Sequence, residues 1–152
     1  MEKNKIVVVA SGYFDPVHSG HINYLEKAKK LGDKLIVIVN NDAQSKLKKE
    51  HGFMSIGERK RIVGAIKYVD EVFVSIDKDR SVIKSLTKIK PDIFAVGTDN
   101  VKGKLLEKDT CDRLGIKIVD RLSRTFMKQS SSKIINKYLK KKACPNCRGG
   151  KK

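Results

Sequence analysis

The stretch from Ile6 to His21 constrains the fold of this chain more than any other part of the sequence. Ile6 to Ala10 is a short, continuous apolar run, which predicts a strand buried on both faces. A polar turn containing Gly12 follows, and from Ser19 onward apolar residues recur at the spacing of one helical face. Strand, glycine-bearing turn and helix therefore occur in the order that a phosphate-binding site requires.

Two histidines, His18 and His21, flank Gly20 at the predicted start of this helix. Free backbone N–H groups and the helix dipole make a helix N-terminus an anion site, and glycine lets a phosphate approach the backbone closely. The two imidazoles can add directed hydrogen bonds to phosphate oxygens. The alternative is a pair of polar loop histidines without a role, and the strand–turn–helix context favours the functional interpretation.

The formal net charge of +17 indicates a preference for anionic partners. Nucleotides, phosphorylated metabolites and nucleic acid all fit such a field, and charge alone does not distinguish them. The 152 residues suffice for one real core, and no apolar stretch is long enough to span a bilayer. We expect a cytoplasmic protein with one domain over residues 1–139 and a basic, disordered tail over residues 140–152.

Three cysteines are an odd number and do not predict a disulfide framework. Cys111 lies in a helical pattern and is expected to be a small core residue. Cys144 and Cys147 form C-P-N-C in the tail, which is half of a four-ligand zinc site. We expect no metal held by protein ligands; an intermolecular zinc site or a redox pair is the alternative to an inert tail.

Five apolar runs alternate with helical patterns along the chain, which predicts a Rossmann-like, doubly wound α/β sheet. The expected strand order is 3-2-1-4-5, with mostly parallel pairing and the first strand in the centre. The expected strands are residues 6–10, 34–39, 71–75, 92–96 and 116–119. Polar residues after these strands should converge at the carboxyl edge of the sheet.

Basic residues cluster after the second expected strand, in residues 43–53. Lys46, Lys48 and Lys49 belong either to a solvated loop or to a flexible lid that closes on phosphates. Ser55 and Glu58 then predict a capping box for a helix with cations in its first turn. Such cations oppose the helix dipole, so at least one of Arg59, Lys60 and Arg61 is expected to face a phosphate.

Two further segments add candidates at the same edge. Asp99 follows the fourth strand and is either a ligand contact or a turn residue. Ser130 and Ser131 begin a run of serines before the last helical pattern, where they are N-cap candidates or a second phosphate-binding helix start.

Residues 12–21, GYFDPVHSGH, resemble the signature G-x-F-D-x-x-H-x-G-H of the cytidylyltransferase-like nucleotidylyltransferases, and the similarity covers most of residues 5–138. This family includes glycerol-3-phosphate cytidylyltransferase, the adenylyltransferase domain of ADP-heptose synthesis and archaeal FAD synthetase. Position 13, often threonine or cysteine in the family, is tyrosine here. The last serine run resembles the family's R-T-x-G-x-S-T-T-x-I, but the glycine is missing and one residue is extra.

The resemblance implies roles for residues across the chain. His18, His21, Lys46 and Arg59 would be catalytic, the histidines holding phosphoryl oxygens, a lysine bridging acceptor and donor, and Arg59 clamping phosphate. The implied nucleotide- or phosphate-binding residues are Gly12, Tyr13, Phe14, Asp15, Gly20, Lys49, Asp99, Arg124, Ser130 and Ser131.

The implied reaction is nucleotidyl transfer from a nucleoside triphosphate to a small phosphorylated acceptor, with Mg²⁺ and release of pyrophosphate. Arg124-Thr125 favours CTP slightly, with glycerol 3-phosphate or a sugar phosphate as acceptor. The alternatives are adenylyl transfer of the heptose-phosphate or FAD-synthetase type, or a basic nucleic-acid-binding protein without catalysis. The lack of aromatic platforms among the basic residues argues against a single-strand binder, and specific nucleic-acid binding is not expected. We also expect a homodimer.

Overall fold

The structure, a computed structural model, describes residues 4–48, 52–97, 105–123 and 130–142. Five strands form one sheet in the order β3-β2-β1-β4-β5. They are β1 (Val7–Gly12), β2 (Lys34–Val39), β3 (Glu71–Val74), β4 (Ile93–Ala95) and β5 (Lys117–Val119). Each neighbouring pair is parallel. The predicted order with a central first strand is therefore confirmed.

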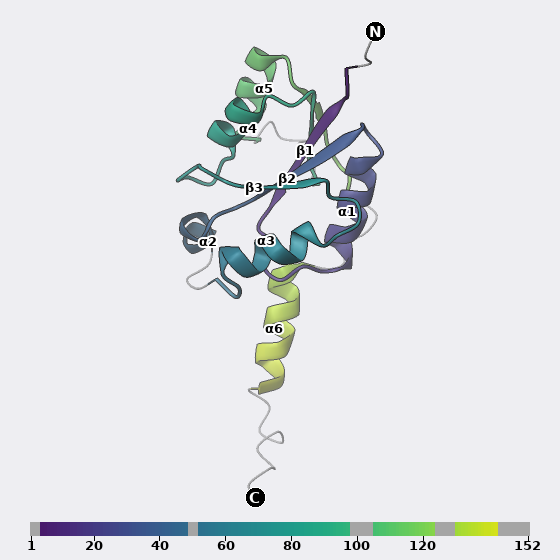
Figure 1. The fold of residues 1–152 in the computed structure, drawn as a ribbon. Helices are drawn as coiled ribbons and strands as arrows, with labels where there is room; N and C mark the ends of the chain where they lie inside the picture. The colour runs from purple at the N-terminus through teal and green to yellow at the C-terminus, as the bar shows by residue number, and fades with distance from the viewer. Residues whose placement is uncertain (1–3, 49–51, 98–104, 124–129, 143–152) are drawn as a thin grey trace, which may run out of the picture.

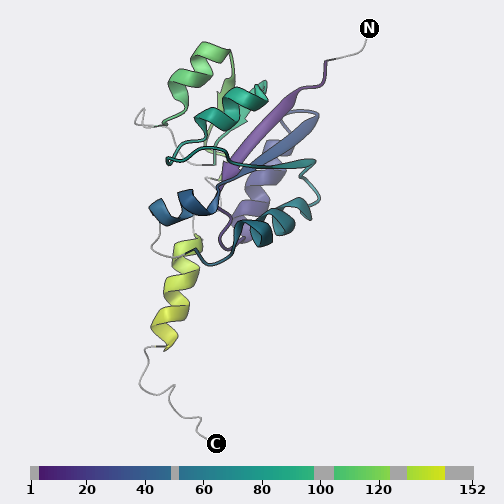
Figure 2. The ribbon, with the colours of Figure 1, turned by 60° about the vertical axis from the view of Figure 1, so that its left-hand side comes forward.

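Helices cover both faces of this sheet, as a doubly wound fold requires (Figure 1). Helices α1 (Ser19–Lys29) and α3 (Ile56–Gly64) pack on one face, and α4 (Ile83–Ile89) and α5 (Lys108–Leu114) on the other. The short helix α2 (Asp42–Lys48) follows the carboxyl end of β2. Helix α6 (Ser131–Lys142) extends away from the body of the molecule in both views (Figures 1 and 2).

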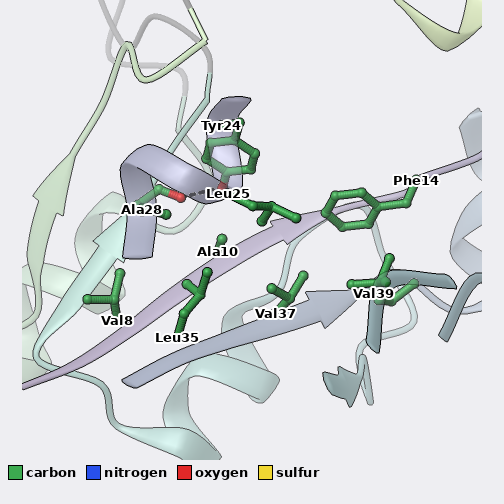
Figure 3. Close-up of a cluster of buried hydrophobic side chains, with 11 residues drawn as sticks. Val8, Ala10, Phe14, Tyr24, Leu25, Ala28, Leu35, Val37 and Val39 are labelled. Carbon is green, nitrogen blue, oxygen red and sulfur yellow. Dashed lines mark hydrogen bonds between the residues drawn. The ribbon is translucent and has the colours of Figure 1, made fainter. Parts of the chain in front are cut away.

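The apolar run of β1 divides its side chains between two cores. Val8 and Ala10 join the cluster under α1 and α3, whereas Val9 packs under α4 and α5. Figure 3 shows the first cluster, in which Leu25 of α1 lies over the strands. Cys111 is fully buried in the second cluster, as predicted for a small core residue.

One local expectation is corrected by the structure. The lysine-rich segment after β2 is not a loop throughout, because residues 42–48 form α2. Helix α1 ends at its C-cap, Lys30, and Gly32 follows in the turn to β2. A Cβ at Gly32 would lie 2.8 Å from the carbonyl oxygen of Ile6, so glycine is needed there for the close approach of the chain to β1.

The last helix passes the residue at which the first domain is expected to end. Helix α6 runs to Lys142, so the expected boundary at residue 139 falls inside a helix. Cys144 and Cys147 lie outside the described residues. Among the helices that the structure describes, none is long and apolar enough to cross a membrane.

Candidate active site

The two histidines of H-x-G-H form the start of α1 through their own ring nitrogens. His18 is the N-cap, and its Nδ1 accepts a hydrogen bond from the backbone N–H of Gly20 at 3.1 Å. Nδ1 of His21 accepts from the backbone N–H of His18 at 3.2 Å. Because each Nδ1 is an acceptor, each neutral ring carries its proton on Nε2. In both imidazoles the donor is therefore the Nε2–H group.

The two rings lie against each other and against Phe14. Their centroids are 3.9 Å apart, and the His21 ring lies 4.9 Å from that of Phe14. Burial lowers the pKa of His18 below its ordinary value, which favours the neutral donor form. Phe14 adopts a left-handed φ of 52°, and a Cβ at Gly12 would lie 3.0 Å from its ring. Gly12 therefore makes room for the aromatic ring beneath His21.

These histidines line a cavity of about 460 Å³ at the carboxyl ends of the neighbouring strands β1 and β4. Such a volume suits a small-molecule ligand. The wall includes the predicted residues Gly12, Tyr13, Phe14, His18, Gly20, His21, Ser130 and Ser131. Phe94, Val96 and Leu105 add an apolar part to it. The structure thus brings together most of the predicted residues that it describes.

The start of α6 closes one side of this cavity. Ser130, Ser131 and Ser132 all belong to the wall. The Ser131 hydroxyl donates to the carbonyl oxygen of Pro16 at 2.8 Å, and the Ser130 hydroxyl accepts from the N–H of Lys133 at 3.2 Å. Ser130 therefore caps α6, as the N-cap interpretation expects, and Ser131 ties the helix to the H-x-G-H loop. The N-terminus of α6 also lies at the cavity wall.

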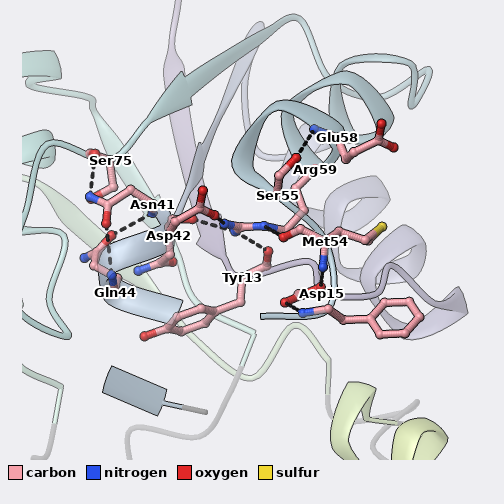
Figure 4. Close-up of polar contacts among 12 residues, drawn as sticks. Tyr13, Asp15, Asn41, Asp42, Gln44, Met54, Ser55, Glu58, Arg59 and Ser75 are labelled. Atoms are coloured by element: carbon pink, nitrogen blue, oxygen red, sulfur yellow. Dashed lines mark hydrogen bonds and ion pairs between the residues drawn. The ribbon is translucent and has the colours of Figure 1, made fainter. Parts of the chain in front are cut away.

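Arg59 requires a correction, because it is not part of the described cavity wall. Its side chain is 0% exposed and donates four hydrogen bonds within the protein (Figure 4). The acceptors are the carbonyl oxygens of Tyr13, Asn40 and Met54 and a carboxylate oxygen of Asp42. Arg59 therefore joins the β1–α1 loop, the end of β2 and the start of α2, instead of clamping a phosphate.

Asp15 is corrected in the same sense. It is 2% exposed, and its carboxylate accepts from the backbone N–H groups of Phe53 and Met54 at 2.8 and 2.7 Å. These bonds hold the segment before α3 against the β1–α1 loop. Asp15 therefore supports the loop that carries wall residues and is not itself part of the described wall of the cavity.

The lysines of α2 are distributed differently from the prediction. Lys46 is exposed and does not belong to the described wall, whereas Lys48 does. The Lys48 Nζ lies 4.5 Å from the centroid of the Tyr13 ring. Lys49, Asp99 and Arg124 lie outside the described residues. Because residues 42–48 are helical, Lys48 lies at the cavity wall and Lys46 does not. An interpretation of this segment as a loop could not distinguish the two lysines.

Tyr24 and Glu107 are among the wall residues that the sequence analysis missed. Tyr24 is buried, and its hydroxyl accepts from the N–H of Ser11 at 3.3 Å and donates to the carbonyl oxygen of Ala95 at 2.5 Å. It therefore joins β1 and β4 at the floor of the cavity. Glu107 accepts from the N–H of Val82 at 2.9 Å, and burial raises its pKa. No motif marked either residue, since each is a single polar group within a helical pattern.

The cytidylyltransferase-like family model matches residues 9–142, which is most of the chain. The chain belongs to the cytidylyltransferase-like family. Relatives include an FAD synthase of Ferroglobus placidus, 38% identical over 135 residues and 87% of each chain. An FAD synthase of Pyrococcus abyssi is 36% identical over 88% of this chain and 92% of the relative. The chain is a nucleotidyltransferase of this family.

The chain is also similar to a longer protein by sequence and to a solved structure. The bifunctional protein HldE of Campylobacter jejuni subsp. doylei is 39% identical over 93% of this chain, which covers 29% of HldE. A crystal structure described as the lipopolysaccharide core biosynthesis protein of Thermoplasma volcanium has a TM-score of 0.66. It is 32% identical and aligns over 77% of this chain and 96% of its own.

Proposed function

We propose that this nucleotidyltransferase transfers the adenylyl group of ATP to FMN, forming FAD and releasing pyrophosphate. The observation that supports nucleotidyl transfer is a pair of imidazoles at the cavity wall whose Nδ1 atoms accept hydrogen bonds from the backbone, so that each neutral ring carries its proton on Nε2. ATP and FMN are favoured over CTP and glycerol 3-phosphate because FAD synthases match across most of both chains.

In this reaction an oxygen of the FMN phosphate attacks the α-phosphorus of ATP, and the bond from that phosphorus to the pyrophosphate oxygen breaks. His18 and His21 would donate to phosphoryl oxygens, on which negative charge builds up in the transition state. Lys48 would add a positive charge at the same wall. We expect direct in-line displacement, in which catalysis rests on positioning and charge stabilisation.

The residues fit a magnesium ion that arrives with the nucleotide. Glu107 is the carboxylate that the described cavity wall presents, and one of its oxygens already accepts from Val82. Within the described residues no group of three or more His, Cys, Asp or Glu side chains could hold a metal. Mg²⁺ commonly takes one or two carboxylates and completes its shell with phosphates and waters. When bound, it would neutralise part of the triphosphate charge.

The test is a matrix of donors and acceptors with purified protein and Mg²⁺. ATP, CTP, GTP and UTP are each combined with FMN, glycerol 3-phosphate or a heptose 1-phosphate, and both pyrophosphate and the coupled product are measured. We expect ATP with FMN to give pyrophosphate and FAD in equal amounts. Turnover of CTP with glycerol 3-phosphate in its place would overturn the choice of substrates, and no pyrophosphate from any pair would overturn nucleotidyl transfer.

The heptose phosphate is included because HldE is 39% identical to this chain over 145 residues. Adenylyl transfer to that acceptor uses the same donor nucleotide and the same phosphate contacts. Only the acceptor distinguishes the two reactions. Product from ATP with heptose 1-phosphate and none with FMN would favour this second function.

A further inference from the structure

Lys48 and Tyr13 form a pair at the cavity wall. Lys48 is the last residue of α2, and its Nζ lies 4.5 Å from the centroid of the Tyr13 ring. Both residues line the cavity together with His18 and His21. This distance is within the range of a cation–π interaction, in which the negative face of the ring attracts the ammonium.

The backbone around both partners is fixed by two arginines. Arg59 donates to the carbonyl oxygen of Tyr13 at 2.9 Å and to Asp42, the first residue of α2, at 2.8 Å. Arg80 donates to the carbonyl oxygen of Leu47 at 2.8 Å, directly before Lys48. The ring and the last turn of α2 therefore keep a defined separation, and the contact does not depend on two freely moving segments.

The nature of this contact matters for an anionic substrate. An aromatic ring orients an ammonium without itself bringing a negative charge beside it. Burial raises the pKa of Tyr13, so the phenol stays neutral and presents its ring rather than a negative oxygen. A phosphate oxygen attracts the ammonium more strongly than the ring does, so the bound nucleotide would displace the ring contact.

We propose that Tyr13 is a positioning residue whose ring holds the Lys48 ammonium at the cavity wall, ready to bind a phosphate oxygen of the nucleotide. This inference rests on the proposed nucleotidyl transfer for its kinetic consequences. The contact itself is a property of the protein without substrate. The two parts can therefore be tested separately.

The kinetic test compares Tyr13→Phe, which keeps the ring, with Tyr13→Leu, which removes it. We expect Tyr13→Leu to raise the KM for ATP about two- to fivefold, the range for an exposed cation–π contact, with kcat changed less. Tyr13→Phe should restore the KM of the wild type. In Lys48→Ala, the further change Tyr13→Leu should have no additional effect, because the group that the ring positions is gone.

A second Lys–Tyr pair supplies matched controls. The Lys67 Nζ lies 5.0 Å from the Tyr68 ring centroid, and neither residue belongs to the described cavity wall. Lys67→Ala and Tyr68→Leu should leave the KM for ATP unchanged. Thermal unfolding of every variant verifies that the kinetic comparison is made on folded protein.

The structural test needs no turnover. In ¹³C-labelled protein, the ring current of Tyr13 should shift the ε-methylene signal of Lys48, which Lys48→Ala identifies. The shift should persist in Tyr13→Phe, vanish in Tyr13→Leu and diminish when inorganic pyrophosphate is added. A Lys48 signal without this shift in the wild type would overturn the pairing, and a shift that pyrophosphate leaves unchanged would overturn its role in phosphate binding.

The two tests separate the possible failures. If no donor and acceptor pair reacts, the proposed function fails, and the NMR titration with pyrophosphate still decides the role of Tyr13. If ATP and FMN react and Tyr13→Leu has the KM of the wild type, the positioning role is wrong and nucleotidyl transfer stands. A loss in Tyr13→Leu that Tyr13→Phe does not restore would assign the effect to the hydroxyl and overturn the proposal.

Discussion

His18 combines a structural and a chemical task in one imidazole ring. Its Nδ1 caps α1, and its Nε2–H remains available at the cavity. Asparagine is a good N-cap but cannot place a donor where Nε2 lies. We therefore expect His18→Asn to keep the unfolding free energy within about 0.5 kcal/mol and to lower kcat by about 10²–10³. Steady-state kinetics and urea unfolding of the same preparation check both parts.

His18→Ala is the companion variant, because it removes the cap as well as the donor. It should lose about 1 kcal/mol of stability in addition to the catalytic defect. His21→Ala should show the same fall in kcat. Near-normal turnover in both His18→Asn and His21→Ala would contradict the assignment of the imidazoles.

The lowered pKa of His18 predicts a dependence of stability on pH. The folded protein holds His18 neutral below its ordinary pKa of 6.5, whereas the unfolded chain takes up the proton there. Protons therefore favour the unfolded state, and stability falls as the pH drops below about 6.5 until the folded pKa is reached. His18→Asn has no imidazole at this position and should not lose stability in this way. Between about pH 7 and about pH 5, the urea midpoint should therefore fall further in the wild type than in the variant.

Arg59 is predicted to govern stability more than substrate binding. Arg59→Met would fill the space and leave three carbonyl oxygens without their donor, one of them, on Asn40, in a buried bond and two in part-buried bonds. Since an unsatisfied buried group costs about 1–3 kcal/mol, the free energy of unfolding should fall by about 1–3 kcal/mol or more. Chemical denaturation measures this. A stable Arg59→Met protein with a raised KM for ATP would return Arg59 to the phosphate clamp that the sequence suggested.

At the scale of elements, the contact of the α1–β2 turn with β1 depends on Gly32. A Cβ there would lie 2.7 Å from a methyl of Val8 and 2.8 Å from the carbonyl oxygen of Ile6. We expect Gly32→Ala to lower the unfolding free energy by about 1–3 kcal/mol through overpacking. Gly57→Ala is the control, since its nearest contact would be 3.9 Å away and alanine favours helix α3. A fully stable Gly32→Ala protein would refute this account.

The sequence contains most of the fold because apolar runs, caps and turns are local signals. The runs predicted all five strands and their order, and Ser55 was recognised as the cap of α3. The H-x-G-H histidines were found because their residue types and spacing carry the chemistry themselves. These signals need no knowledge of distant contacts.

The remaining site residues depend on contacts that no local pattern records. Arg59 was expected to face a phosphate because a cation in the first turn of a helix needs a negative partner. Its acceptors are instead main-chain oxygens of separate segments, which leave no pattern in the sequence. The choice between Lys46 and Lys48 depends on the helical phase of α2, and residues 43–53 were interpreted as a loop. Tyr24 acts through a hydroxyl that reaches both β1 and β4, which only the assembled sheet brings together.

At the scale of the whole molecule, the net charge of +17 is a source of self-repulsion. Raising NaCl from about 10 mM to about 150 mM shortens the screening length from about 30 Å to about 8 Å. We expect the unfolding midpoint to rise by a few degrees over this range, equally in NaCl and KCl. Differential scanning fluorimetry measures the midpoint, and a midpoint that stays flat or falls would contradict the prediction.

The bond from Ser131 to Pro16 joins two segments that lie 115 positions apart in the sequence. The H-x-G-H loop is made early in translation, whereas the part of the cavity wall formed by residues 130–132 is made near the end. Both parts of the wall are therefore present together only after nearly all of the described chain has been synthesised.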